Sequence, residues 1–114
     1  MNVRILARWV DDPTESPITL DATLDERKRL SGKWTVFGAT DIDTARARPF
    51  ALDREGRMDF GAGRAEGDRV WRTDVRAASI EVGAAFTVTW SGGERGVYRI
   101  EKVSVLGTKK SEES

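Results

Sequence analysis

The chain has 114 residues, and its 19 basic and 19 acidic side chains give a formal net charge of zero at pH 7. A chain of this length is expected to form one domain that buries about two-thirds of its unfolded surface. It contains no cysteine and no histidine, which excludes disulfides, zinc–thiolate sites and the Ser-His and Cys-His nucleophile pairs. The balanced charge argues against a chain built mainly to hold polyanions.

Cellular location is predicted from the N-terminal residues. Arg4 and Arg8 interrupt the apolar stretch there, so neither a secretory signal nor a membrane span is expected in the chain. We therefore expect a soluble cytoplasmic protein without membrane contact. Arginine exceeds lysine and alanine is frequent, which is typical of G+C-rich bacterial or phage coding sequences.

Alternating apolar and polar residues predict two strands near the N-terminus. The first covers residues 3–9 and ends at Asp11-Asp12-Pro13, and the second covers residues 18–22. Residues 23–26 then match the spacing of a capping box, and Ser31-Gly32 supplies a stop. This pattern predicts a helix of about two turns over residues 24–30.

The middle of the chain predicts a further strand and a hairpin. Residues 34–39 form the strand, and the hairpin turns at residues 53–56, where Gly56 can take the left-handed position. Residues 61–68 are expected to form a flexible loop, and residues 70–75 return to extended structure. The apolar residues of the hairpin share one parity and are expected in the core: Phe50, Leu52, Met58 and Phe60.

The C-terminal third predicts a second hairpin, with its turn at residues 91–96. Phe86, Val88 and Trp90 alternate with threonines before the turn, and Tyr98 and Ile100 alternate with charged residues after it. The next apolar pair, Val103 and Val105, falls on the opposite parity. A β-bulge or bend near Glu101-Lys102 is therefore expected.

These elements predict the fold class. Seven or eight short strands with at most one short helix indicate a mainly β, small single domain over residues 1–107, folded as an antiparallel barrel or sandwich. Residues 108–114 are expected to be a disordered charged tail. The passage from Ile80 through Gly83 to Phe86 and Trp90 resembles the start of a strand in SH3-like small barrels. The resemblance covers the last quarter of the chain, implies an SH3-like or similar barrel and carries over no site residue.

Two motifs that could hold a cofactor or metal fail on spacing. Gly61, Gly63 and Gly67 lack the third glycine of a dinucleotide fingerprint, because Glu66 stands there, and Gly-Lys-Ser/Thr is absent. The residues Asp41-Ile42-Asp43 do not continue as a calcium loop, since position six is arginine and position twelve is leucine. We predict a mobile loop and an acidic turn, and neither cofactor nor metal.

Acidic residues in the middle of the chain raise the possibility of hydrolysis. Paired carboxylates hydrolyse glycosides, but arginines interleave with these acids, and a solvated salt-bridged face explains them without catalysis. The acids are Asp53, Glu55, Asp59, Glu66 and Asp68, and the arginines are Arg54, Arg57, Arg64 and Arg69.

Arginines around Trp71 form the remaining candidate site. An aromatic ring between guanidinium groups can stack on bases, hold phosphates or anchor a protein interface. Nearby acids cancel much of the local potential, and a tryptophan in an alternating strand is more often a core residue. Of the four tryptophans (Trp9, Trp34, Trp71 and Trp90), Trp71 is the one expected at the surface. The predicted contact residues are Trp71, Arg69, Arg72, Arg76, Arg46 and Arg48.

Three functional hypotheses follow. The first, reached mainly by elimination, is a non-catalytic protein-binding module of bacterial or phage origin, such as an immunity-type inhibitor, an accessory subunit or a phage component. The second is a nucleic-acid-binding barrel that uses the arginine and tryptophan residues named above. The third is a carboxylate-dependent hydrolase.

Overall fold

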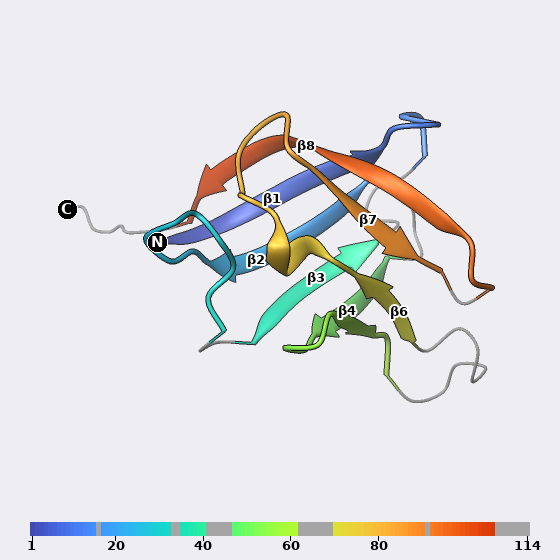
Figure 1. Cartoon of the computed structure of the whole chain (residues 1–114), viewed down its shortest axis with the longest axis horizontal. Coiled ribbons are helices and arrows are strands. Elements are labelled where there is room, and N and C mark those ends of the chain that lie inside the picture. The colour runs from blue at the N-terminus through green and yellow to red at the C-terminus, as the bar shows by residue number, and fades with distance from the viewer. Residues whose placement is uncertain (16, 33–34, 41–46, 62–69, 91, 107–114) are drawn as a thin grey trace.

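The computed structural model describes residues 1–15, 17–32, 35–40, 47–61, 70–90 and 92–106. Across these ranges eight strands form one closed antiparallel barrel, in which each strand pairs with the next and β8 pairs with β1 (Figure 1). The mainly β fold is confirmed, and of the two expected architectures the barrel is the correct one. The strands are β1 (Asn2–Trp9), β2 (Ile18–Thr23), β3 (Val36–Thr40), β4 (Arg48–Leu52), β5 (Arg57–Asp59), β6 (Val70–Thr73), β7 (Ala85–Thr89) and β8 (Arg95–Val105).

The core is the barrel interior, and it is filled by the apolar side chains at alternate positions of the strands. On β1, Val3, Ile5 and Ala7 are fully buried, while Arg4 between them is exposed. The same alternation runs through the other strands, because successive side chains of a strand point to opposite faces of the sheet. The expected inward residues of the β4–β5 hairpin are confirmed, since Phe50, Leu52, Met58 and Phe60 are all buried.

The expected bulge near Glu101-Lys102 is confirmed in the pairing of β1 with β8. Leu6 lies opposite Lys102, whereas Ala7 lies opposite Ile100, so Glu101 has no partner residue on β1. The extra residue shifts the phase of β8. Val103 consequently lies opposite Ile5 and packs against the core.

The expected helix over residues 24–30 is wrong. The Asp25 carboxylate accepts hydrogen bonds from the backbone N–H groups of Arg27 and Arg29, at 2.8 and 3.0 Å, and Lys28 takes a left-handed φ of 61°. A short acidic side chain that bonds nearby backbone donors stabilises a turn instead of a helix. Leu24 and Leu30 therefore face each other in an isolated antiparallel bridge.

One end of the barrel, which we call the capped end, is covered by the β2–β3 and β6–β7 connections. A single 3-10 turn, η2 (Val75–Ala77), lies there, and Val75, Ile80 and Leu30 are buried. The backbone N–H of Ile80 donates to the carbonyl of Lys28 at 2.7 Å and joins the two connections. No helix in the described ranges is long and apolar enough to cross a membrane.

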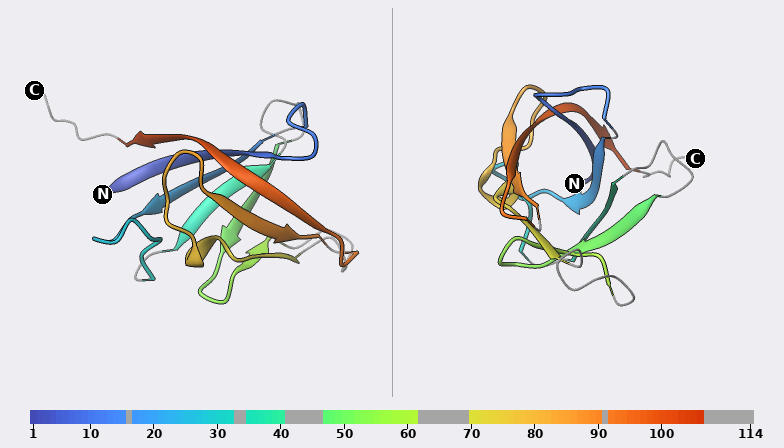
Figure 2. Two further views of the ribbon diagram at one scale, coloured as in Figure 1. Left: turned by 45° about the horizontal axis from the view of Figure 1, so that its top comes forward. Right: turned by 90° about the vertical axis from the view of Figure 1, so that its right-hand side faces the viewer.

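The opposite end, which we call the tryptophan end, is where β1, β3, β5 and β7 finish. Trp9 is the last residue of β1, and Trp90 directly follows β7. Trp71 is the second residue of β6, which starts at this end because the strands alternate in direction. The right-hand view of Figure 2 looks along the barrel from this end, with the strands in a ring around the interior. Trp34, most of the expected loop over residues 61–68 and the expected tail over residues 108–114 lie outside the described ranges.

The β4–β5 turn is closed by Asp53. Its Oδ1 accepts hydrogen bonds from the backbone N–H groups of Glu55 and Arg57, both at 2.9 Å, and its Oδ2 pairs with Arg57 Nε at 2.6 Å. These contacts stabilise the ionised carboxylate. The backbone N–H of Arg57 makes the largest contribution to holding the pKa of Asp53 below its usual value.

The lowered pKa of Asp53 predicts the pH dependence of stability. A carboxyl whose pKa is lower in the folded state stabilises the fold above its unfolded pKa of about 3.9, and this contribution is lost as the pH falls through the folded pKa. Asp53→Asn should therefore lose less stability than the wild type between about pH 5 and 3. Urea unfolding at several pH values measures this. Because the chain has no histidine, stability of both proteins should be nearly constant between about pH 6 and 8.

Candidate functional site

Four aromatic rings meet inside the tryptophan end. Trp9 and Trp90 pack edge to face with their ring centroids 5.3 Å apart, and Trp90 packs in the same way on Trp71 at 6.5 Å. Trp71 in turn packs on Phe60 at 4.8 Å. The three tryptophans are only partly buried, whereas Phe60 is buried. The result is a continuous aromatic layer across the barrel with its tryptophans open to contact.

Gly96 on β8 leaves the space that two of these rings occupy. A Cβ atom built on Gly96 would overlap the ring of Trp90 and would lie 2.9 Å from Nε1 of Trp9. The absence of a side chain at this position therefore allows both indoles to pack over the strand.

Arg48 points into the same end of the barrel. It shares the parity of Phe50 and Leu52 on β4, both of which are buried. Its guanidinium carbon lies 4.7 Å from the centroid of the Phe60 ring and 5.2 Å from that of Trp71. Cation–π contacts of this kind contribute about 0.5–2 kcal/mol each, but they supply no negative charge. No carboxylate in the described part of the chain forms an ion pair with Arg48.

Three buried side-chain polar atoms in the described ranges have no hydrogen-bond partner, and all three lie at the tryptophan end. They are Trp9 Nε1, Thr40 Oγ1 and Arg48 Nε. Leaving a buried polar group unpaired costs about 1–3 kcal/mol, and more for a charged group. The indole and guanidinium nitrogens can only donate, and a hydroxyl can donate as well as accept. The end of the barrel is therefore rich in unused donors.

The structure brings together only part of the predicted contact set. Trp71 and Arg48 contact each other on the inward side of the barrel, so Trp71 is only partly exposed and does not lie on the outer surface. Arg72 lies on the outer face of β6, opposite Thr89. Arg76 lies at the capped end and donates to the backbone carbonyls of Asp53, Ser31 and Leu52 at 2.8, 3.4 and 3.4 Å. Arg46 and Arg69 lie outside the described residues.

Four members of the tryptophan end were missing from the predicted set: Trp9, Thr40, Phe60 and Trp90. Trp9 and Trp90 were assigned to the core, and Phe60 was assigned to the core as part of its hairpin. Thr40 was not singled out. One sequence signal was available for Arg48, since it has the same parity as Phe50 and Leu52. That parity places an arginine on the inward face of a strand, where a charge without a partner is unusual.

Two described members of the acidic cluster, Asp53 and Glu55, pair with arginine. Arg57 contacts Asp53 at 2.6 Å and Glu55 at 3.8 Å, and all three side chains are at least partly exposed. Asp59 accepts a hydrogen bond from the backbone N–H of Gly61 at 2.8 Å. These contacts fit a solvated salt-bridged face. Among the described residues no three acids lie close enough to hold a metal ion. The other acids and glycines considered above lie outside the described ranges: Asp41, Asp43, Gly63, Glu66, Gly67 and Asp68.

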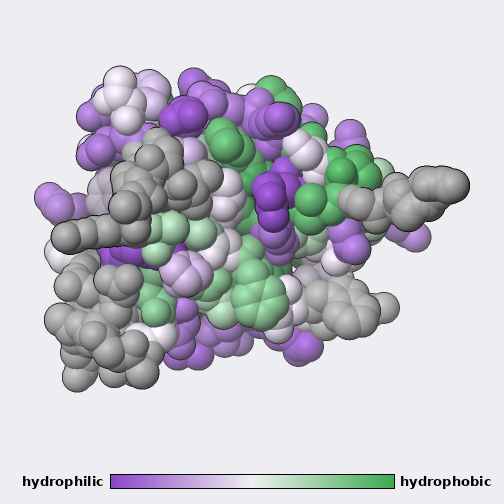
Figure 3. All heavy atoms as spheres, turned by 180° about the vertical axis from the view of Figure 1, so that it is seen from behind, coloured by the Kyte–Doolittle hydropathy of each residue, from purple (hydrophilic) through white to green (hydrophobic). Residues whose placement is uncertain are grey.

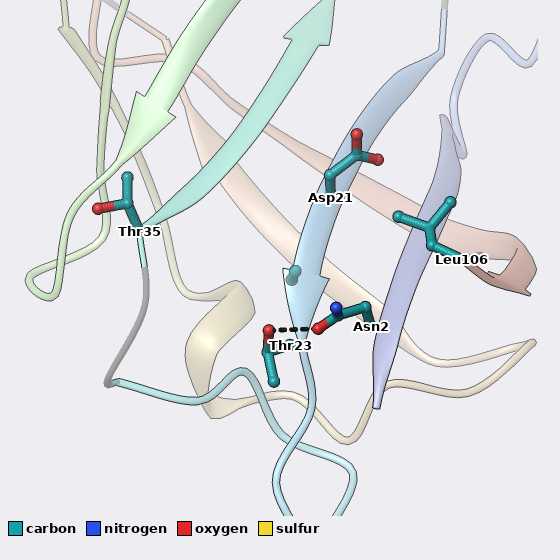
Figure 4. Close-up of a pocket in the computed structure, with 6 residues that line it drawn as sticks. Asn2, Asp21, Thr23, Thr35 and Leu106 are labelled. Carbon is teal, nitrogen blue, oxygen red and sulfur yellow. Dashed lines mark hydrogen bonds between the residues drawn. The ribbon is translucent and has the colours of Figure 1, made fainter. Parts of the chain in front are cut away.

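A separate cavity of about 360 Å³ lies beside the N-terminus, between β2 and the residue preceding β3 (Figure 4). Three polar side chains in its lining, those of Asn2, Asp21 and Thr23, bond to other protein groups. Thr23 Oγ1 donates to Asn2 Oδ1 at 2.7 Å, and Arg4 holds the Asp21 carboxylate with two contacts of 2.7 and 2.8 Å. None of the three buried unpaired polar atoms found among the described residues lies in this cavity.

The outer surface carries one large exposed aromatic residue among those described. Phe37 on β3 is 60% exposed, and it lies between Asp21 of β2 and Ala51 of β4. Ala51 also lines a groove of about 280 Å³ that extends to Val70. Figure 3 shows exposed apolar residues among hydrophilic ones on one face of the molecule.

Comparison with protein families, curated proteins and solved structures finds no match for this chain.

Proposed function

We propose that this protein is a non-catalytic binding module that receives a small molecule with a flat apolar part at the tryptophan end of the barrel. An eight-stranded barrel has an interior just wide enough for side chains or for one small ligand, and the mouths of barrels are common ligand sites.

The observation that supports the proposal is the difference between the two ends. The capped end is closed by the buried aliphatic side chains of Leu30, Val75 and Ile80. The tryptophan end instead presents partly exposed indoles at Trp9, Trp71 and Trp90. Aromatic side chains combine a large apolar area with preferred stacking geometries, so they suit a flat ligand.

Binding is favoured over catalysis by the residues that face the interior at this end. The chain has no histidine or cysteine. Among the described inward-facing residues of the tryptophan end none is a carboxylate, so none of the described side chains there supplies the usual general base. The side chains present can stack on a molecule and donate hydrogen bonds to it.

Nuclear magnetic resonance of the indole N–H groups tests this proposal with 2-naphthylmethanol and 2-naphthoate as ring probes. Either probe should shift the signals of Trp9, Trp71 and Trp90, assigned from single Trp→Phe variants. Phe60→Leu removes a ring but keeps apolar bulk, and it should weaken binding. Phe37→Ser, on the outer face, should not. The proposal fails if neither probe binds, or if Phe37→Ser and not Phe60→Leu removes the shifts.

A protein partner on the outer face of the barrel is a second candidate, favoured by the exposure of Phe37. Aromatic residues are enriched at protein interfaces, and truncation of an interface hot spot weakens binding by about 2 kcal/mol or more. A partner isolated with the wild-type protein should therefore bind purified Phe37→Ser at least about 30-fold more weakly. Equal affinity of the two proteins would remove Phe37 as the contact.

A further inference from the structure

We propose that the ligand of the tryptophan end is an aromatic carboxylic acid, whose carboxylate is held by Arg48 and Thr40. This inference rests on the proposed function, because it names the chemical class that the same site would take.

The two anion-binding residues face each other across one rung of the barrel wall. Thr40 is the last residue of β3 and lies directly opposite Arg48, the first residue of β4. Residues directly opposite each other in an antiparallel pair have their Cβ atoms about 5 Å apart and on the same face of the sheet. Thr40 is only 5% exposed, and its hydroxyl has no partner. A single small group can therefore contact both side chains.

The free edge of Arg48 determines the shape of that group. Arg48 Nε has no acceptor, so the N–H at that edge of the guanidinium is unused. This edge presents two parallel N–H groups, which match the two oxygens of a carboxylate. Arg48 makes no ion pair with a described residue, and a bound carboxylate would supply a countercharge for it.

The rings beside Arg48 determine the rest of the ligand. The ring centroids of Phe60 and Trp71 lie 4.7 and 5.2 Å from the guanidinium carbon of Arg48. The part of a ligand next to its carboxylate would therefore contact these two rings. Trp90 extends this surface toward Trp9. A carboxylate attached directly to a flat ring satisfies both parts of the site, and a longer aliphatic acid would leave the indoles without a stacking partner.

Calorimetric titration of a matched probe pair tests the inference. The probes 2-naphthoate and 2-naphthylmethanol share a ring system, and at pH 7 only the first is charged. Wild-type protein should bind 2-naphthoate at least about tenfold more tightly, which is the contribution of a charge-assisted hydrogen-bonded pair. Arg48→Met should abolish this preference without weakening the alcohol. Arg72→Met, an arginine on the outer face of β6, is the matched control and should keep the preference.

Thr40→Val provides a second variant that preserves shape and removes the unpaired hydroxyl. It should lower the affinity for 2-naphthoate several-fold, leave that for the alcohol unchanged, and be no less stable in urea than the wild type. If Arg48→Met does not fold, the same titrations are made with Thr40→Val and with Arg48→Lys. The lysine variant keeps the charge but loses the bidentate edge.

The outcomes separate this inference from the proposed function. Equal binding of both probes by the wild type would leave the proposed function standing and overturn the carboxylate assignment. The assignment also fails if the preference for 2-naphthoate survives Arg48→Met and Thr40→Val, since the anion would then be held elsewhere. Failure of both probes to bind would refute the proposed function itself.

Discussion

Gly56→Ala should destabilise the barrel by about 3 kcal/mol, as measured by urea unfolding. Gly56 has a φ of +86°, where a residue with a Cβ is strained by about 1–2 kcal/mol. A Cβ on Gly56 would also overlap the backbone carbonyl oxygen of Thr73. That carbonyl is fixed on both sides, because the N–H of Thr73 donates to Gly56 at 2.8 Å and its Oγ1 donates to Thr87 at 2.8 Å. Relief of the overlap would require the β5–β6 ladder to move.

Gly83→Ala is the matched control for this experiment. Gly83 has a similar φ of +94°, but no atom lies within 4 Å of the position that its Cβ would take. It should therefore show the conformational strain alone, about 1 kcal/mol. Equal losses for the two variants would mean that contact with Thr73 adds nothing to the effect.

Much of the fold could be predicted because the strand periodicity is regular. The β4–β5 and β7–β8 hairpins follow directly from parity, and so does the bulge at Glu101, since Val103 and Val105 break the phase that Tyr98 and Ile100 set. A barrel differs from a sandwich in the pairing of β1 with β8, which joins strands from opposite ends of the chain. No local pattern encodes such a contact.

The error over residues 24–30 has a local cause. An acid at Asp25 fits the first turn of a helix as well as it fits a turn in which the carboxylate bonds backbone donors, and the sequence pattern does not distinguish the two. The structure selects the turn, because Ile80 bonds to the carbonyl of Lys28, and Leu30 is buried at the capped end. These contacts come from a connection about fifty residues away in sequence.

The candidate site was only partly predictable for a similar reason. Arg48 and Trp71 were both singled out, but as members of an exposed set that also included Arg72 and Arg76. Adjacent residues of a strand point to opposite faces, so Trp71 and Arg72 could not share a surface. The contact between Arg48 and Trp71 depends on closure of the barrel, which brings the starts of β4 and β6 to the same end.

Trp90→Ala should destabilise the protein by about 3 kcal/mol and reduce the near-ultraviolet circular dichroism of the tryptophans, because Trp90 packs edge to face on both Trp9 and Trp71. Gly96→Ala should cost about 2 kcal/mol in the wild type, since its Cβ would overlap the Trp90 ring. In the Trp90→Ala protein that ring is gone, so the same change should cost about 1 kcal/mol less, a coupling measurable in a double-mutant cycle. Gly92→Ala, where no atom lies within 4 Å of the position that an added Cβ would take, should be nearly neutral in both proteins. Additive losses for Trp90→Ala and Gly96→Ala would contradict the packing of Trp90 over Gly96, and with it the continuous aromatic layer on which the proposed binding site depends.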